Sequence, residues 1–215
     1  MAIFHLHLKN ISRGDGRSAV ACAAYRAGET LPNEAEERQS KFGGRRDVRF
    51  SEIVLPVGAP PWMGERGRLW NAVEAAERRR DARLAKEIEV ALPRELSPSQ
   101  QVELVRAMAT GLASGGLVVD FAIHDDGLNT NPHAHMMLTT RAVSTAGFAG
   151  KLRGADDKAF LQQTRALWGK LTNLFLSKAG VVASVDHRSH AARGLGDRPG
   201  DHRGIDPNER LLKRD

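Results

Sequence analysis

The sequence predicts an α+β fold: an antiparallel sheet of about five strands, with helices packed on one face and an open polar cleft on the other. Short segments along the chain alternate apolar and polar residues with a period of two, which is typical of strands that bury one side. Segments with helical spacing lie between them and are bounded by capping residues. The polar faces of the strands carry histidine and glutamate, so these side chains would line the uncovered face of the sheet.

Composition narrows the class of protein. The 215 residues suit one sizeable domain, and a hydrophobic content of 41% is ample for a core. The net charge of +6 favours a polyanionic partner such as nucleic acid, although charge alone also allows an anionic membrane surface. One cysteine excludes an internal disulfide and a cysteine-based zinc site. No apolar run approaches the ~20 residues of a membrane span, and the N-terminus lacks a signal-peptide layout, so we expect a cytoplasmic protein without membrane insertion.

The N-terminal part of the chain predicts a strand followed by a helix. Residues 2–9 alternate, which places His5 and His7 on the polar face of the strand. An alanine-rich helix follows over residues 19–27, with a serine before it and a glycine after it as capping residues. This helix carries Tyr25, the only tyrosine in the chain. The helix alone does not decide whether Tyr25 is a functional residue or an aromatic packed on the core.

The next segments alternate between irregular, extended and helical patterns. Residues 29–47 are polar and irregular, so we expect a mobile loop in which Arg45 and Arg46 are candidate phosphate contacts. The stretch VRFSEIVLP predicts a strand, and residues 61–80 predict a helix. The end of that helix and the residues just beyond it hold four arginines, which form either a solvated face or a surface that follows a DNA backbone. They are Arg78, Arg79, Arg80 and Arg83.

The segment AKEIEVALP predicts a strand with Glu87 and Glu89 together on the polar face. A capping box then opens a helix at residue 97 that ends near residue 115. Two strands with apolar and polar faces follow, over residues 117–124 and again from His133.

The C-terminal part of the chain predicts four further segments. A glycine-rich loop covers residues 147–154, and a long helix begins at residue 156 or 157 and ends at Gly180. The inward stripe predicted for that helix includes Leu174. VVASVDHRS predicts a short final strand. We expect the folded domain to span residues 1–190 and residues 191–215 to form a charged, glycine-rich tail, the start of a linker to a further domain.

Three histidines come together in the predicted sheet. His133 and His135 are two residues apart, so on a strand they point to the same face with Cα atoms roughly 6–7 Å apart. The turn-rich stretch DDGLNTNP precedes them, and an antiparallel hairpin around it would bring His124 across from the other two. A His-x-His pair alone is often only a surface feature. Three imidazoles on one face predict a transition-metal site with open coordination positions, the kind that is used for chemistry.

A metal ion held by three neutral imidazoles keeps its positive charge and can polarise a phosphoryl oxygen. A basic protein would bring phosphodiesters to it. The nucleophile is then either a metal-bound water or a side chain, and Tyr25 is the candidate side chain, although a phenol needs the help of a metal or a base at neutral pH.

Four stretches of the sequence resemble successive motifs of the MobA/MobL (MobQ-type) plasmid mobilisation relaxases. They are SRGDGRSAVACAAYRAGE, AKEIEVALPRELS, HDDGLNTNPHAHMMLTTR and VDHRSHAARG. The resemblance covers roughly residues 1–195 in the expected order, whereas the residues beyond depart from the pattern. This family of His-hydrophobic-His nucleases has a five-stranded antiparallel sheet flanked by helices. Its members nick one strand at a plasmid transfer origin, stay attached to the 5′ end through tyrosine, and reseal the break.

The resemblance assigns roles by position. Tyr25 matches the nucleophile, and the three histidines match the metal ligands. Glu87 and Glu89 fall on the acidic strand near the active site, where we expect one of them to orient a histidine or take the tyrosine proton; the sequence leaves open which one. The candidate DNA-binding residues are Arg17, Arg26, Arg45, Arg46, Arg78, Arg79, Arg80, Arg83, His5 and His7.

The resemblance also implies a cofactor and partners. The cofactor is a divalent ion, Mn²⁺ or Mg²⁺ first, with Zn²⁺, Co²⁺ or Ni²⁺ as alternatives. The partners are single-stranded transfer-origin DNA with an adjoining hairpin, accessory mobilisation proteins, and the type IV coupling and secretion machinery. The expected location is the bacterial cytoplasm, with transfer to a recipient cell alongside the DNA. Larger relatives carry helicase or primase domains.

Three alternatives remain open from the sequence. A rolling-circle replication initiator would use the same chemistry, but such proteins usually place the tyrosine after the His-x-His strand, whereas here it lies about 100 residues before it. A metal-dependent phosphodiesterase would use water in place of tyrosine. A non-catalytic nucleic-acid binder would leave three converging histidines unexplained.

Overall fold

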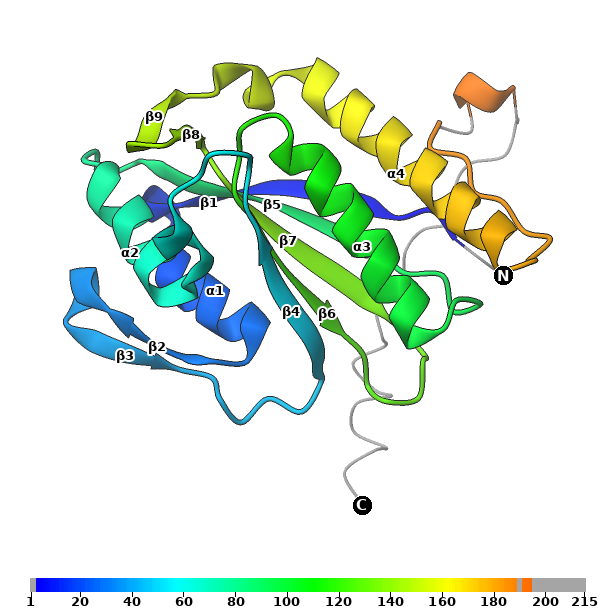
Figure 1. Ribbon diagram of the computed structural model, residues 1–215, viewed down its shortest axis with the longest axis horizontal. Helices are drawn as coiled ribbons and strands as arrows, with labels where there is room; N and C mark the ends of the chain where they lie inside the picture. The colour runs from blue at the N-terminus through cyan, green and yellow to red at the C-terminus, as the bar shows by residue number, and fades with distance from the viewer. Residues whose placement is uncertain (1–2, 189–190, 195–215) are drawn as a thin grey trace.

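A computed structural model of the chain describes residues 3–188 and 191–194. Its centre is a five-stranded antiparallel sheet in the order β1-β5-β7-β6-β4 (Figure 1). The strands are β1 (Leu6–Ser12), β4 (Val48–Val54), β5 (Arg83–Ala91), β6 (Val119–His124) and β7 (His133–Thr139). The predicted α+β class with an antiparallel sheet of about five strands is therefore confirmed.

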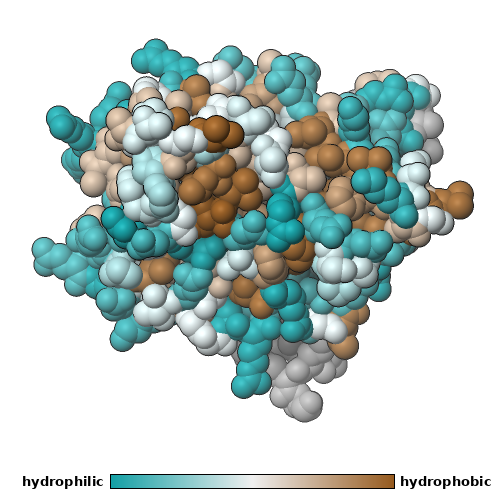
Figure 2. All heavy atoms as spheres, viewed as in Figure 1, coloured by the Kyte–Doolittle hydropathy of each residue, from teal (hydrophilic) through white to brown (hydrophobic). Residues whose placement is uncertain are grey.

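Two helices cover one face of the sheet. α3 (Pro98–Ala113) lies in front of the strands in Figure 1, and α4 (Lys158–Lys178) runs beside it. Ile88, Phe121 and Met136, from three neighbouring strands, are fully buried in the core beneath these helices. This face matches the predicted apolar pattern, because every second residue of each strand points to it. Figure 2 shows apolar side chains between hydrophilic ones over α3 and α4.

The other face is only partly open, which corrects the prediction of helices on one face alone. α1 (Ala19–Ala27) and α2 (Arg66–Ala76) pack over one end of it and form a second core. That core buries Ile11, Ala85 and Met137, which lie on the same strand faces as the glutamates and histidines. The polar cleft therefore occupies only the end of this face where the histidines lie. The alternation pattern identified the faces correctly, but it did not show that each strand changes from apolar to polar along this face.

Two segments predicted as loops are β-hairpins. Residues 29–47 contain β2 (Thr30–Asn33) and β3 (Arg38–Lys41), which pair with each other as a separate two-stranded sheet. The glycine-rich region is also a hairpin, formed by β8 (Arg141–Ser144) and β9 (Gly147–Lys151). These strands of four or five residues are too short to show a clear alternation, so their polar composition suggested loops.

Other boundaries also differ from the predictions. The helix expected over residues 61–80 is a 3₁₀ turn (Pro61–Gly64) followed by α2, which ends at Ala76. Arg78, Arg79 and Arg80 therefore lie in a connecting loop, and Arg83 begins β5. Residues 181–188 of the expected final strand are not in a strand, and residue 189 lies outside the described residues. Leu174 of α4 is 44% exposed and lies outside the buried stripe, which runs through Thr164, Trp168, Thr172 and Leu176.

The predicted tail lies mostly outside the described residues, apart from a 3₁₀ turn (Ala191–Arg193). No helix among the described residues has the combination of length and apolar character that crossing a membrane requires.

The predicted helix caps are confirmed at α1 and α3. The Ser18 hydroxyl accepts a hydrogen bond from the Ala21 amide at 3.3 Å, and Gly28 ends α1 with a φ of 66°, a left-handed conformation that suits glycine. Ser97 and Gln100 form the predicted capping box of α3. Ser18 and Gly28 therefore fix the two ends of α1, the helix that carries Tyr25.

A buried ion pair joins α2 to the central sheet. The carboxylate of Asp120, on β6, accepts hydrogen bonds from Arg66 Nε and Nη2 at 2.9 Å each and from Trp70 Nε1 at 2.8 Å. All three side chains are nearly inaccessible to solvent. Removing Asp120 would leave the buried Arg66 guanidinium with only the partly exposed Glu29 carboxylate as counter-charge and the buried Trp70 N–H without its acceptor, which costs far more than an exposed pair contributes.

We expect Asp120→Ala to lower the free energy of unfolding by about 3–5 kcal/mol, because the Arg66 guanidinium loses its buried counter-charge. Urea denaturation followed by circular dichroism measures the change. The matched control is Asp81→Ala, which removes a carboxylate paired with Arg79 on the surface and should leave the denaturation midpoint unchanged. Equal effects of the two substitutions would contradict a structural role for the Asp120 pair.

Candidate active site

The three histidines meet at one end of the sheet, as their spacing predicted. β6 and β7 pair so that His124 lies opposite His133, and His135 lies opposite the small residue Ala122. The ring centroids are 5.0–5.4 Å apart, and one nitrogen from each ring lies within 4.8 Å of the other two. Small Ala122 leaves space for the three rings to face a common point.

Each histidine ring has one nitrogen engaged with an oxygen that can only accept a hydrogen bond. The acceptors are the Arg26 carbonyl for His124 Nε2 (2.6 Å), the Asn131 carbonyl for His133 Nδ1 (2.8 Å) and the Glu87 carboxylate for His135 Nδ1 (2.9 Å). The engaged nitrogen must therefore carry the hydrogen, which leaves the lone pair on the other nitrogen of each neutral ring. His124 Nδ1, His133 Nε2 and His135 Nε2 are the free donor atoms.

This donor set fits a divalent transition-metal ion. Burial is the main cause that lowers the pKa of His124 to about 4, so its ring is neutral at physiological pH and can offer a lone pair. Three imidazole nitrogens with no thiolate among them favour Mn, Zn, Co or Ni over the oxygen-preferring Mg. With three protein ligands, an ion would keep coordination positions open for a substrate.

The Glu87 carboxylate is completely buried and accepts the hydrogen bond from His135 Nδ1. Burial, the largest single influence, raises the pKa of the Glu87 carboxyl, but the hydrogen bond from His135 and the charge of Arg26 outweigh it and hold the pKa at about 2. The carboxylate is therefore ionised and acts only as an acceptor, which fixes the tautomer of His135.

The guanidinium of Arg26 is committed to Glu87. Its Nε donates to Glu87 Oε1 at 2.6 Å and its Nη1 to the Cys22 carbonyl at 2.8 Å, and the residue is 7% exposed. This placement argues against the prediction that Arg26 contacts DNA. Arg26 instead supports two histidines, His135 through Glu87 and His124 through its own carbonyl.

The structure separates the two glutamates that the sequence left equivalent. Glu89 lies opposite His135 in the β5–β7 pairing, and its side chain is 32% exposed. Its nearest cation is Lys9, at 3.7 Å. Glu89 therefore faces the cleft with an accessible carboxylate, whereas Glu87 is enclosed.

Tyr25 is 46% exposed, so the alternative of an aromatic packed in the core is wrong. It lines a cleft of about 540 Å³ together with the three histidines, Glu89, Lys9 and Arg17. α1 brings it there because the helix crosses the polar face of the sheet, and the Arg26 carbonyl, from the next residue, touches His124.

The other candidate DNA-binding residues fall into two groups. Arg17 and Arg45 line the cleft, and Arg46 is exposed next to Arg45. His5 and His7 are also exposed. His5 directly precedes the edge strand β1, and His7 lies on it, paired in register with Glu89. Lys9 was not among the predicted site residues, although it lies two residues after His7 on the same strand and therefore on the same face.

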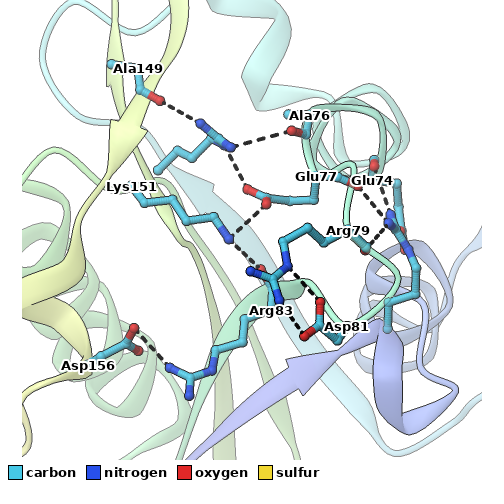
Figure 3. A network of polar contacts seen from close by, with 11 residues as sticks. Glu74, Ala76, Glu77, Arg79, Asp81, Arg83, Ala149, Lys151 and Asp156 are labelled. Carbon is cyan, nitrogen blue, oxygen red and sulfur yellow. Dashed lines mark hydrogen bonds and ion pairs between the residues drawn. The ribbon is translucent and has the colours of Figure 1, made fainter.

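The second group, from Arg78 to Arg83, lies away from the cleft. Arg83 begins β5, whereas Glu89 is near the opposite end of that strand. Figure 3 shows Arg79 paired with Asp81 and Arg83 with Asp156 in a network that also joins Lys151 to Glu77. Arg78 and Arg80 are exposed in the same loop. The structure does not bring this cluster to the histidines.

The fold of this chain resembles that of a solved relaxase. A solved structure of the conjugative relaxase TrwC, in complex with oriT DNA and with metal bound, superposes with a TM-score of 0.54 at 12% sequence identity, covering 82% of this chain and 71% of that one. A likeness at this identity concerns the fold alone. The chain belongs to the MobA/MobL family, whose model matches residues 17–213, past the predicted domain boundary at residue 190. The resemblance seen in the sequence motifs is thereby confirmed.

Individual relatives agree with the family assignment. Mobilization protein MobL of Acidithiobacillus ferridurans is 35% identical over 95% of this chain, and conjugal transfer protein TraA of Agrobacterium fabrum is 33% identical over 95%. The chain spans 62% of the length of the first and 21% of the second. A solved structure described as the molecular basis of vancomycin resistance transfer in Staphylococcus aureus has a TM-score of 0.83 and 29% identity, covering 87% of this chain and 100% of that one.

Proposed function

We propose that this chain is a DNA relaxase that nicks one strand at a plasmid transfer origin through Tyr25 and later reseals it. Membership of the MobA/MobL family, with relatives described as mobilisation and conjugal transfer proteins, supports this function. The observation that carries the proposal is the exposed Tyr25 in the same cleft as three histidine nitrogens with free lone pairs.

In the proposed reaction, the Tyr25 phenol oxygen attacks the scissile phosphorus. The new oxygen–phosphorus bond forms as the bond from phosphorus to the 3′ oxygen breaks. The 3′ oxygen leaves with the bonding electron pair and takes up a proton, while the phenol proton passes to a base. The product is a 5′-phosphotyrosine diester and a free 3′-hydroxyl. One diester replaces another, so the reverse attack of the 3′-hydroxyl can reseal the strand.

Glu89 is our candidate for the base that accepts the phenol proton, because its carboxylate is accessible in the cleft that Tyr25 lines. Glu87 would act differently, through its hydrogen bond to His135. The three histidines would hold the divalent ion, with Mn²⁺ preferred over Mg²⁺ because the donors are imidazole nitrogens. When bound there, the ion would supply Lewis-acid polarisation of the scissile phosphate.

Basic side chains around the cleft would position the DNA. Arg17 and Lys9 line the cleft, and Arg46 is exposed beside it, so we assign them to the phosphates of the single strand near the cleavage position. The exposed Arg78 and Arg80 lie beyond the cleft, where we assign them to the adjoining DNA hairpin. Accessory mobilisation proteins and the type IV coupling machinery in the bacterial cytoplasm would be the protein partners.

Covalent capture tests this function. The protein is incubated with Mn²⁺ and single-stranded oligonucleotides that tile the replicon carrying its gene, and products are separated on a denaturing gel. We expect one oligonucleotide to give a protein–DNA adduct, and mass spectrometry of the digested adduct to locate the nucleotide on Tyr25. Absence of an adduct across the whole tiling set would overturn the proposal.

The same experiment separates the alternatives. A phosphodiesterase that uses water would release two DNA fragments without an adduct, and Tyr25→Phe would retain activity. A rolling-circle initiator would form the same adduct, but on oligonucleotides from a replication origin. The accessible phenol in the cleft favours tyrosine over water as the nucleophile.

Glu87→Gln is expected to weaken Mn²⁺ binding by ~10–100-fold, the usual cost of losing the partner that orients a metal-binding histidine. Gln keeps the shape of Glu but removes the charge that faces His135 and Arg26. Isothermal titration calorimetry measures the affinity. The control is Glu89→Gln, which should keep the Mn²⁺ affinity and slow cleavage instead. Loss of Mn²⁺ affinity in the Glu89 variant alone would reverse the two assigned roles.

A further inference from the structure

The segment that follows β3 packs against the Tyr25 ring. The guanidinium carbon of Arg45 lies 3.8 Å from the centroid of that ring, which is a close cation–π contact. Phe42 meets the ring at 5.3 Å with an interplanar angle of 89°, the edge-to-face arrangement favoured between aromatic rings. Tyr25 is thus partly exposed, yet it is held from two directions by residues about twenty positions further along the chain.

Arg45 is itself fixed by several hydrogen bonds. Its Nε donates to Asp47 Oδ1 at 2.9 Å, its Nη2 donates to Asp47 Oδ2, and its Nη1 donates to the Tyr25 carbonyl at 3.2 Å. A bidentate pair between a planar guanidinium and a carboxylate sets the orientation of both groups. The two hydrogen bonds to Asp47 therefore fix the orientation of the Arg45 guanidinium plane.

The same segment is tied to the strand that carries a candidate metal ligand. The Asp47 carbonyl accepts a hydrogen bond from the Asp125 amide at 2.9 Å, and Val48 pairs with His124 in the β4–β6 ladder. Asp125 directly follows His124. One short path of backbone and side-chain contacts therefore joins the Tyr25 ring to the histidine cluster, so both are positioned relative to the same strand end.

Arg45 has little capacity left for DNA. Three of its nitrogen atoms donate within the protein, the side chain is 17% exposed, and its flat face covers the phenol. Arg46, the next residue, is exposed and has no interaction among those described for this part of the structure. The two neighbouring arginines, which sequence analysis treated alike, are therefore in different environments.

We propose that Arg45, anchored by Asp47, is a positioning residue that orients the Tyr25 phenol for attack, and that it is not a direct DNA contact. This inference rests on the proposed relaxase function. A near-attack geometry is sensitive to small displacements, so a ring that loses this support would react more slowly without losing its hydroxyl.

A test of the ring's position does not require activity. Because Tyr25 is the only tyrosine, ¹³C labelling of tyrosine ring carbons gives one probe in the full chain. We expect nuclear Overhauser contacts from the Tyr25 ring to Phe42 and Arg45 in the unmodified protein, and loss of the Phe42 contact in Arg45→Ala and in Asp47→Asn. Arg46→Ala is the matched control and should keep it. Persistence of the Phe42 contact in both Arg45→Ala and Asp47→Asn would overturn the proposal.

Adduct formation then separates positioning from binding. Arg45→Ala and Asp47→Asn should lower kcat by ~10–100-fold with little change in KM, the size expected from a small misplacement of a reacting group. Arg46→Ala should raise KM with little change in kcat. A raised KM with unchanged kcat in Arg45→Ala would mean that Arg45 binds DNA, which also overturns the proposal. If the unmodified protein forms no adduct, the relaxase function fails, whereas the ring contacts still decide whether Arg45 and Asp47 hold Tyr25.

Discussion

Tyr25→Phe is expected to abolish the covalent protein–DNA adduct and to reduce strand cleavage by at least ~10³-fold, as removal of a nucleophile usually does. The substitution removes one oxygen atom and keeps the ring that packs against Phe42 and Arg45. Because the side chain is 46% exposed, the fold should be unaffected. Denaturing gel electrophoresis with a labelled oligonucleotide measures both the adduct and the cleaved strand.

Two controls make this result decisive. The thermal unfolding temperature and the affinity for uncleaved DNA should be the same for Tyr25→Phe and the unmodified protein, since neither depends on the hydroxyl. An adduct formed at the original rate would place the nucleophile elsewhere. Cleavage at the original rate without an adduct would favour the alternative in which water attacks the phosphate.

Substitution of one of the clustered histidines should have the second large effect. His133→Ala removes one of three candidate ligand atoms, so we expect Mn²⁺ affinity to fall by more than the ~10–100-fold typical of losing an outer hydrogen-bond partner. Cleavage should fall in parallel. Electron paramagnetic resonance of free Mn²⁺ during a titration measures binding directly, and it does not depend on finding the cognate DNA.

His7→Ala provides the matched control for that measurement. His7 lies on the same face of the sheet, on the edge strand, paired in register with Glu89 but outside the histidine cluster. Its removal should leave Mn²⁺ binding unchanged. If His7→Ala and His133→Ala weakened Mn²⁺ binding equally, the ion would be held by scattered surface imidazoles, and the cluster would lose its assigned role.

The parts of the site that follow from local periodicity were predictable. Residues two apart on a strand share a face, so the positions of His133 and His135 follow from their spacing alone. The turn-rich sequence between His124 and His133 indicated the hairpin that β6 and β7 form. The caps of α1 and α3 were likewise recognisable, because Ser18 and Ser97 act on amides only three residues away.

The roles of the polar residues around that site were not predictable. Glu87 and Glu89 are two residues apart on one strand, as His133 and His135 are, so the sequence alone does not distinguish them. They differ because Arg26, on a helix about sixty residues earlier, covers Glu87 and leaves Glu89 open to the cleft. Arg45 and Arg46 differ for a similar reason, since only the first reaches both Asp47 and the Tyr25 ring.

The sequence by itself determined the two faces of each strand, the caps of α1 and α3, and that three imidazoles share one face, because each of these depends on repeats and caps within a few residues. Only the tertiary structure decided that α1 and α2 cover one end of that face, that Arg26 supports the histidines, and that Tyr25 opens into their cleft. Those features depend on how α1 crosses the sheet, and long-range packing of this kind leaves no periodic signal in the chain.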